Sequence, residues 1–316
     1  MSLSDIKIGV VGVGGWGKNH VRVLNELRVL EAICDVNEER VKEFSRKYEV
    51  DGYTDLEKFL EHDLDGVIVS TPTKTHYEIA LKSIEKGRHV LVEKPFTYNV
   101  DEGERLVRRA KEKNVILTVG FIERFNPAIR EAKRLVSNGV IGEPLYLLFA
   151  RENRWPVHII DVGVILDTSI HDIDLSRWFF GEEPMMVFAR MGAFGTEHER
   201  VSALVLGFSK EKTSLIISNW ITPRKVRELE IVGENGTISL DFITQQIKID
   251  LEDRTDIPRT RYEEPLLLEL KHFIECINGG REPEVVGEDG VKATKIAHAA
   301  LASNRLGSAI FIHLER

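Results

Sequence analysis

The sequence predicts an α/β protein with two parts: an N-terminal Rossmann domain on a doubly wound parallel sheet, and a C-terminal α+β domain on an open, mostly antiparallel sheet. Two observations lead to this prediction. Early in the chain, short apolar runs alternate with helical stretches, which is the pattern of βαβ units. Later, strand-like runs follow one another directly and glycines separate them. We therefore expect a first domain over residues 1–122 and a second domain over residues 123–316.

The expected elements follow in order. In the first domain we expect strands at residues 6–11, 30–34, 66–69, 90–92 and 115–119, and helices at 18–27, 38–48, 56–61 and 101–113, with one more ending at Lys86. In the second domain we expect a helix ending near Asn138, helices at 167–180, 267–278 and 289–305, and strands at 144–150, 186–191, 201–208, 213–220, 226–232, 236–240, 246–249 and 309–313. The charged segment 252–264 is expected to be a solvated loop.

Composition limits the functional classes. The chain has 316 residues, 42% of them hydrophobic and 30% charged, and a formal net charge of −8, which argues against nucleic acid or a membrane surface as the main partner. No apolar run approaches the ~20 residues that span a bilayer, and no signal pattern opens the chain. The two cysteines occur without Cys-x-x-Cys or His-x-x-x-His patterns. We expect a cytoplasmic protein with a small-molecule substrate and no metal.

A glycine-rich segment follows the first expected strand. Gly12, Gly14 and Gly17 fit G-x-G-x-x-G, with a strand before the motif and a helix after it. In this motif the glycines allow a tight turn, the approach of a pyrophosphate to the backbone, and close packing of helix on strand, while amides at the helix N-terminus hold the phosphates. The alternative is a glycine-rich turn that binds nothing.

The second expected strand ends at Asp35, close to the offset at which dinucleotide-binding proteins carry an acidic residue. A carboxylate at this position binds both ribose hydroxyls of NAD and repels the 2′-phosphate of NADP. Val36 and Asn37 supply no cation to offset that repulsion. NAD is therefore the expected cofactor, unless the acid is unrelated to the glycine motif.

Two further strands end in polar segments. Ser70–Thr73 follows one of them, and Glu93 and Lys94 follow another. Ligands bind at the carboxyl ends of strands in open α/β sheets, where a lysine is either held in an ion pair or available for chemistry. Thr75 and Glu78 have capping-box spacing. The residues expected at the cofactor are Gly12, Gly14, Gly15, Trp16, Gly17, Asp35, Ser70, Thr71, Pro72, Thr73, His76, Glu93 and Lys94.

A second polar constellation lies in the second domain. If residues 167–180 are helical, Asp167, His171 and Asp174 fall on one face. An aspartate one turn before a histidine fixes its tautomer and raises its basicity, as a general base requires. Two alternatives remain: a capped helix with a satisfied polar pair, and a metal site built from His171, Asp172 and Asp174, for which no further ligand cluster is evident.

Taken together, the motifs resemble the Gfo/Idh/MocA family of oxidoreductases. The resemblance rests on Gly-Val-Gly-Gly-Trp-Gly-Lys-Asn-His at 12–20, Ser-Thr-Pro-Thr-x-x-His at 70–76, Glu-Lys-Pro at 93–95, Arg-Phe-Asn-Pro at 124–127 and Asp-x-x-x-His-x-x-Asp at 167–174. It implies NAD-dependent oxidation or reduction at a sugar or polyol carbon. It also implies that Lys94 and His171 touch the reacting hydroxyl, with Asp167 nearby. Ser169 departs from the glycine that many members have there.

The segments around 124–127 and 161–167 look like the nucleotide-sugar branch of the family, in particular UDP-N-acetylglucosamine 3-dehydrogenases. The expected substrate contacts are Arg124, Asn126, Arg151, Arg154 and His158, although exposed arginines after a strand need no function. One alternative is a dehydrogenase of a free polyol or sugar such as myo-inositol. Another is a non-catalytic NAD-binding regulatory protein, which the intact Lys94 and His171 disfavour.

Assembly is expected from the second domain. A sheet with one helix-covered face leaves its other face to be buried, and the runs at 204–206 and 215–217 are apolar on both sides. We therefore expect a homo-oligomer, either a dimer or a tetramer.

Overall fold

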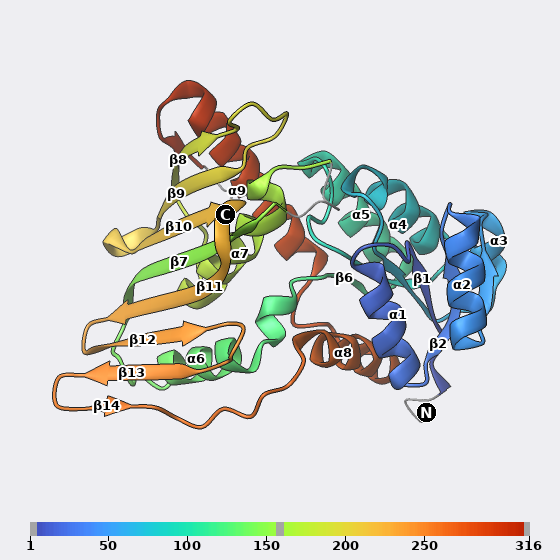
Figure 1. Cartoon of the computed structure of the whole chain (residues 1–316), viewed down its shortest axis with the longest axis horizontal. Helices are drawn as coiled ribbons and strands as arrows, with labels where there is room; N and C mark the ends of the chain where they lie inside the picture. The colour runs from blue at the N-terminus through green and yellow to red at the C-terminus, as the bar shows by residue number, and fades with distance from the viewer. Residues whose placement is uncertain (1–4, 156–160, 313–316) are drawn as a thin grey trace. The chain divides into compact units, whose positions relative to one another are not determined.

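The computed structural model describes residues 5–155 and 161–312, which form two compact units (Figure 1). The first unit runs to Ile122 and takes in Leu266–Thr294 as well. The second comprises Glu123–Pro265 and the chain from Lys295 onward. The division after residue 122 is where the sequence placed it, but residues 266–294 were expected in the second domain. They fold with the first unit because Phe273 and other apolar side chains of this segment enter its core.

The first unit contains a parallel sheet whose order, in the described residues, is β3-β2-β1-β4-β5-β6. The central strands β1 and β4 are continuous buried runs without alternation, as expected of strands covered on both faces. The sequence reasoning missed β3, because this strand is short and mostly exposed. The strands are β1 (Ile8–Val11), β2 (Leu30–Cys34), β3 (Asp51–Tyr53), β4 (Gly66–Val69), β5 (His89–Val92) and β6 (Leu117–Val119).

The helices of this unit end where their sequences indicate. The side chain of Asn37 caps α2 by accepting a hydrogen bond from the Arg40 amide, and Asn99 caps α5 in the same way. Glu49 and Asn114 then end these two helices with left-handed backbone. The helices are α1 (Gly17–Glu26), α2 (Glu38–Tyr48), α3 (Leu56–Glu61), α4 (His76–Glu85), α5 (Val100–Lys113) and α8 (Pro265–Gly279).

The sheet of the second unit is mixed and mostly antiparallel, as expected; in the described residues only β10 and β7 pair in parallel. Its order is β14-β13-β12-β11-β7-β10-β9-β8-β15. β14 lies in the segment expected to be a loop. The strands are β7 (Pro144–Arg154), β8 (Met186–Gly192), β9 (Val201–Gly207), β10 (Thr213–Asn219), β11 (Ile221–Gly233), β12 (Gly236–Asp241), β13 (Ile247–Leu251), β14 (Thr255–Asp256) and β15 (Ile310–Phe311).

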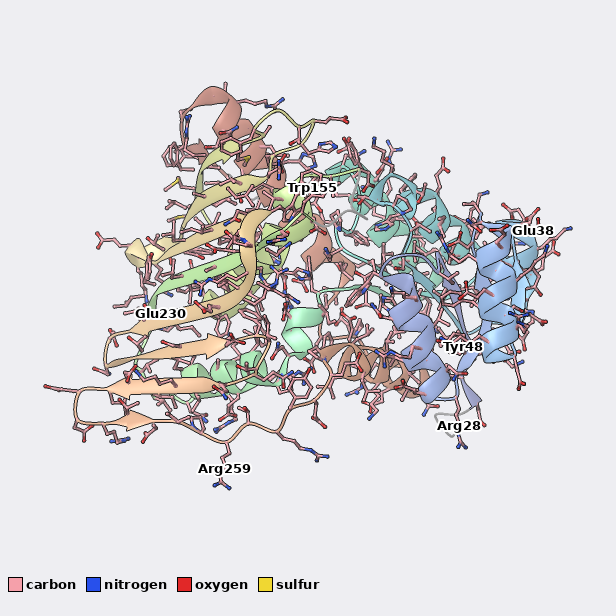
Figure 2. The ribbon with its side chains drawn as sticks, viewed as in Figure 1. Arg28, Glu38, Tyr48, Trp155, Glu230 and Arg259 are labelled. Carbon is pink, nitrogen blue, oxygen red and sulfur yellow. The ribbon has the colours of Figure 1, made fainter. Side chains whose placement is uncertain are left out.

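One face of this sheet is covered by helices. α7 (Ile170–Phe180) packs on β7 and β10, and α6 (Pro127–Ser137) packs on β12. Alternate residues of β7, including Phe149, are buried on this covered face. Residues between them, including Leu148, are only half-buried on the open face, and Glu230 of β11 is exposed (Figure 2). α9 (Gly287–Leu306) begins in the first unit and ends in the second.

Candidate active site

Three strand ends meet at one edge of the first unit's sheet. β1, β4 and β5 are neighbours, and each is parallel to the next. The Ser70 amide donates to the Val11 carbonyl at 2.9 Å, and the Glu93 amide donates to the Val69 carbonyl at 2.9 Å. These bonds place the glycine-rich segment, the 70–73 segment and the 93–95 segment side by side, as the sequence led us to expect.

The glycines leave the room that a dinucleotide needs. Gly12 has φ +88°, and a Cβ there would lie 2.5 Å from the Ser70 carbonyl oxygen. A Cβ on Gly17 would lie 1.8 Å from the Gly12 carbonyl oxygen. At Gly14, by contrast, a Cβ would meet only the guanidinium of Arg40, at 3.1 Å. Gly12 and Gly17 are thus required by the fold, whereas Gly14 keeps a backbone surface open, which fits a pyrophosphate approaching the loop.

Asp35 follows β2 and is almost fully buried. Its carboxylate accepts hydrogen bonds from the amides of Val13 and Asn37, each at 2.9 Å, and lies 3.2 Å from Nη1 of Arg40. Val36 and Asn37 supply no cation, as the sequence shows, but Arg40 supplies one that the sequence reasoning did not consider. Arg40 is five residues away in sequence, but the first turns of α2 bring its side chain back to the strand end.

Glu93 links the strand end to the glycine-rich segment. Its Oε1 accepts from Nε1 of Trp16 at 2.8 Å and lies 2.7 Å from Nε2 of His20, and its Oε2 accepts from the Lys94 amide at 3.1 Å. Burial alone raises the pKa of Glu93, but the hydrogen bond and charge of His20, with the charge of Lys94, bring it below its ordinary value. Glu93 is therefore an ionised anchor, and Lys94 follows it at the end of β5.

His76 joins two of the strand-end segments. Its Nδ1 lies 2.9 Å from the Pro95 carbonyl oxygen, and its Nε2 lies 2.8 Å from the Thr71 carbonyl oxygen. Both ring nitrogens therefore face backbone, and the residue positions the cofactor site rather than offering a nitrogen to a ligand. Thr75 donates to Oγ1 of Thr71 and does not cap α4, so the capping box expected with Glu78 does not form.

In the second unit, His171 lies in the first turn of α7, directly after a π-helical turn at Ile165–Ser169. The sequence predicted one α-helix from residue 167. Asp167 belongs instead to the wider π turn that precedes α7. Oδ2 of Asp167 accepts from Oγ1 of Thr168 at 3.0 Å. Single π turns occur often at functional sites, and this one adjoins the expected base.

A layer of buried hydroxyls lies under that turn. Oγ of Ser169 donates to Oγ of Ser218 at 2.9 Å and lies 3.2 Å from Oγ of Ser202. Ser169 has φ −68°, an ordinary helical value. A serine in place of the glycine that many family members have therefore imposes no backbone strain, and its hydroxyl ties the turn to β9 and β10.

The aspartates of α7 pair with arginines. Arg124 donates to Asp174 through Nε at 2.7 Å and through Nη2 at 2.5 Å. Arg151 donates to Asp172 through Nε at 2.6 Å and to Glu123 through Nη1 at 2.7 Å. Burial raises the pKa of Asp172 to about 6, although Arg151 opposes this shift. The described residues contain no cluster able to hold a metal ion, and these ion pairs replace the alternative metal site.

The other expected substrate contacts differ in position. Asn126 is buried: its Oδ1 accepts from the Ala128 amide at 3.1 Å, capping α6, and its Nδ2 donates to the Phe242 carbonyl at 3.0 Å. Arg154 is exposed at the end of β7. His158 lies outside the described residues. Arg124, Asn126 and Arg151 thus have partners within the second unit, and of the described four only Arg154 is open to solvent.

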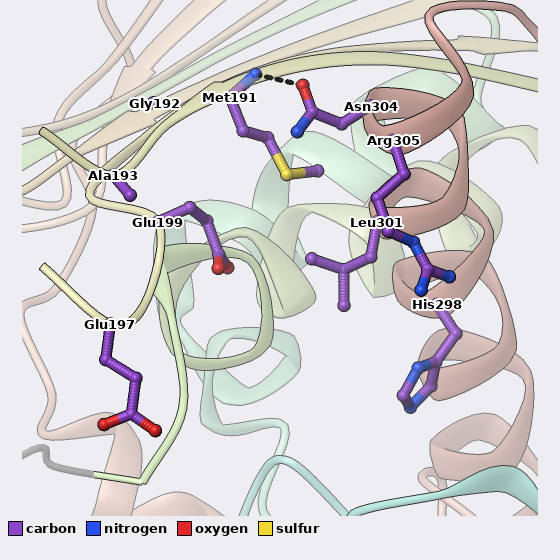
Figure 3. A pocket seen from close by; sticks show the side chains of 9 residues that line it. All are labelled: Met191, Gly192, Ala193, Glu197, Glu199, His298, Leu301, Asn304 and Arg305. Atoms are coloured by element: carbon purple, nitrogen blue, oxygen red, sulfur yellow. Dashed lines mark hydrogen bonds between the residues drawn. The ribbon is translucent and has the colours of Figure 1, made fainter. Parts of the chain in front are cut away.

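A hollow of about 460 Å³, which the sequence did not indicate, lies between the end of β8 and α9 (Figure 3). Glu199 lines it together with Leu301 of α9, and the Met191 amide donates to Oδ1 of Asn304 at its margin. Oε1 of Glu199 also accepts from the Ile165 amide at 3.1 Å. The wall of this hollow therefore anchors the π turn that carries Asp167.

Known proteins share this architecture. A model of the oxidoreductase family with the NAD-binding Rossmann fold matches residues 6–121, and a model of the GFO/IDH/MocA C-terminal domain matches residues 129–239. The chain is 31% identical to the myo-inositol 2-dehydrogenase of Thermotoga maritima, over 94% of this chain and 96% of that protein. It is 28% identical to the UDP-N-acetylglucosamine 3-dehydrogenase of Acidithiobacillus ferrooxidans, over 94% and 95%. A solved structure of the latter has a TM-score of 0.88 at 26% identity, covering 94% of this chain and 97% of that one.

The fold and the site define an NAD-dependent oxidoreductase, and NAD is confirmed as the expected cofactor. The chain belongs to the Gfo/Idh/MocA family, as its motifs indicated. Within the described ranges, no helix combines the length and the apolar character that a membrane crossing requires.

Proposed function

We propose that this protein transfers a hydride between NAD and a secondary hydroxyl of a nucleotide sugar, UDP-N-acetylglucosamine at its 3-position. The observation that carries the proposal is the match, along nearly the whole chain, to the UDP-N-acetylglucosamine 3-dehydrogenase of Acidithiobacillus ferrooxidans in both sequence and fold. The described site adds support. Lys94 follows an anchored carboxylate at a strand end, and His171 follows a π turn in the second unit.

The roles follow from the chemistry of the side chains. His171 accepts the proton of the substrate hydroxyl, and Asp167 supports the base electrostatically. Lys94 supplies positive charge where alkoxide character develops on the hydroxyl oxygen. The nicotinamide, when bound, provides the hydride acceptor or donor. Glu93 and His76 position the segments around Lys94 without taking part in the reaction.

Substitution of the two central residues tests these roles. Lys94→Ala and His171→Ala are each expected to lower turnover roughly 100-fold or more, with NADH affinity largely kept. Lys86→Ala and His198→Ala change a lysine and a histidine elsewhere in the two units and serve as matched controls. Turnover within a few-fold of the unsubstituted protein in either site variant contradicts the assignment.

A paired assay tests the substrate. UDP-N-acetylglucosamine, N-acetylglucosamine and myo-inositol are each incubated with the protein and NAD, and NADH is followed by its absorbance. Because tightly held NADH would hide turnover, a second series includes 2-oxoglutarate as a regenerating oxidant. Oxidation of the nucleotide sugar well above the two neutral compounds is the expected result.

A polyol dehydrogenase is the second candidate, because the myo-inositol 2-dehydrogenase of Thermotoga maritima is 31% identical to this chain. Oxidation of myo-inositol or a free sugar alone would select this candidate. NADH binding without turnover of any sugar or polyol would instead indicate a regulatory protein that retains the fold.

We also propose that the open face of the second unit's sheet is buried in a homodimer or homotetramer. Leu148, Leu215 and Val205 are half-buried neighbours across β7, β10 and β9, so they form an apolar row on this face. Light scattering at micromolar concentration is expected to give a dimer or tetramer, and Leu215→Lys is expected to shift the mass towards the monomer. A monomeric unsubstituted protein contradicts the proposal.

A further inference from the structure

Two arginines face each other on the covered face of the second unit's sheet. In the antiparallel register of β7 and β11, Arg227 lies directly opposite Arg151. Both strands turn these residues towards the buried side, in line with Phe149 and Leu229. Like charges directly opposite one another destabilise a sheet. The pair therefore requires compensating negative charge.

Arg151 has that compensation through direct hydrogen bonds, whereas Glu123, Asp172 and Asp167 act on Arg227 only through space. Asp172 and Glu123 each accept a charge-assisted hydrogen bond from Arg151. Arg227 donates through Nη2 to the neutral amide oxygen of Asn153 at 3.2 Å. Its Nη1 is buried, and no acceptor for it occurs among the described residues. Arg227 as a whole is half-buried. A guanidinium with a buried, unpaired nitrogen and no carboxylate hydrogen-bonded to it is costly, and anionic oxygens are the ligands that suit it best.

The backbone next to Arg227 is irregular. Ile221 pairs with Arg154 and Val226 pairs with Glu152, so the four residues 222–225 lie opposite Asn153 alone. This wide bulge carries two more cations, Arg224 and Lys225. β-bulges occur often beside active sites, where they redirect side chains. The bulge thus adds accessible positive charge next to the buried guanidinium.

We infer that Arg227 and Lys225 form an anion-binding subsite that receives the phosphate or carboxylate group of the substrate. The inference deepens the proposed function and rests on it: a nucleotide sugar carries a diphosphate, whereas a neutral polyol has no group for this subsite. It also replaces Arg151 as the expected diphosphate contact, because Arg151 already forms ion pairs with Asp172 and Glu123.

The electrostatics agree with this geometry. Burial and the nearby charge of Arg151 lower the pKa of Arg227 to about 10. Burial and the charge of Arg227 also lower the pKa of Lys225. Burial is the larger cause of both shifts, and positive neighbours add to it, so an anion beside Arg227 and Lys225 would oppose both effects. Asp167 contributes to the field at Arg227, which places the subsite within electrostatic reach of the proposed catalytic segment.

Binding to the full-length protein tests the inference without requiring turnover. The protein is saturated with NAD, so that the glycine-rich segment is occupied, and is then titrated calorimetrically with UDP or with glucuronate. UDP is expected to bind the unsubstituted protein, and Arg227→Gln is expected to weaken it at least tenfold. Arg227→Lys, which keeps the charge, is expected to fall between them. Arg224→Gln, on the same bulge but outside the proposed subsite, serves as the matched control and is expected to stay within about threefold.

Thermal unfolding provides a second readout. If Arg227 serves a ligand, then Arg227→Gln removes an unmatched buried charge and leaves the melting temperature of the ligand-free protein unchanged or higher. UDP then raises the melting temperature of the unsubstituted protein but not that of the variant. A clear fall in the melting temperature of the ligand-free variant, with UDP affinity kept, would show a purely structural role.

The outcomes separate this inference from the proposed function. Oxidation of UDP-N-acetylglucosamine with unchanged UDP affinity in Arg227→Gln overturns the subsite and leaves the function standing. Glucuronate binding that depends on Arg227, without UDP binding, keeps the subsite and overturns the nucleotide sugar. No binding of either anion to the unsubstituted protein overturns the subsite.

Discussion

The indole N–H of Trp16 donates to the carboxylate of Glu93 over 2.8 Å, joining the glycine-rich segment to the end of β5. His20 approaches the same oxygen at 2.7 Å. Trp16 and His20 thus hold the carboxylate of Glu93, which lies far from both in the chain. This bridge joins the glycine-rich segment to the strand end that carries Lys94.

Replacing Glu93 with Gln keeps the shape of the side chain and removes its charge. We expect Glu93→Gln to lower the free energy of unfolding by about 1.5 to 3 kcal/mol, because two donors lose an ionised acceptor. NADH is also expected to bind more weakly, since Trp16 is released. Chemical denaturation and NADH fluorescence measure the two effects. Glu104→Gln, on the exposed side of α5, is the control, and equal behaviour of the two variants would contradict the bridge.

Gly120 provides the space for that carboxylate. A Cβ at this position would lie 2.9 Å from Oε2 of Glu93. Gly120→Ala is therefore expected to destabilise the protein by about 1 to 3 kcal/mol through overpacking. The control is Gly279→Ala at the last residue of α8, where a Cβ meets nothing within 4 Å, so alanine is not expected to destabilise the protein. A lower denaturation midpoint in both variants, or in neither, would contradict this prediction.

We expect cofactor choice to depend on Asp35 and Arg40 together, because their side chains lie 3.2 Å apart. Asp35→Ala removes the group that repels a 2′-phosphate and leaves Arg40 to attract it. We expect the ratio of NADPH to NADH affinity to rise by about tenfold, or about 1.4 kcal/mol. Adding Arg40→Gln to this variant is expected to reverse most of the gain. Fluorescence titrations with both cofactors measure the ratio, and an unchanged ratio in Asp35→Ala would mean that the carboxylate acts only on the loop amides.

His76 makes part of the stability depend on pH. Burial lowers its pKa, and the carbonyls of Thr71 and Pro95, with the charge of Glu93, oppose this shift. A histidine whose pKa is lower in the folded state stabilises the fold above its unfolded pKa of about 6.5, and this contribution is lost as the pH falls through the folded value. Between pH 7.5 and 5.5, the unsubstituted protein should therefore lose more stability than His76→Gln. Urea unfolding at both values measures the difference, with His198→Gln as the control.

Much of the fold was predictable because apolar periodicity is local. The apolar runs at 30–34 and 66–69, for example, predict strands from their own residues alone, without information on which strands they pair with. The π turn was not predictable, because its five-residue hydrogen bonding leaves no mark on the sequence period. β3 was missed for a related reason: its exposed residues have no apolar pattern, and pairing with β2 creates the strand.

Several candidate site residues were proposed from their positions at strand ends, whereas the residues that contact them could not be predicted. The sequence showed Asp35 and Glu93, but the positions of Arg40 and Trp16 beside them depend on helix phase and tertiary packing. The partners of Arg151 and Arg227 were likewise not predictable from the sequence. Arg151 was expected at a ligand and lies in a buried ion pair. Arg227 drew no attention, because its position opposite Arg151 appears only once the register of β7 and β11 is known.

The first unit is discontinuous, and this affects the order in which the protein forms during synthesis. Leu270, Phe273 and Ile274 pack against Ile8 and Val10 of β1, yet the ribosome makes them only after nearly all of the second unit. Until residues 266–294 are synthesised, part of the apolar surface of the nascent Rossmann sheet therefore stays exposed to solvent. Such exposure favours aggregation or chaperone binding. A fragment ending at residue 122 would stay in that state permanently, so residues 266–294 must be supplied for the nucleotide-binding unit to fold alone.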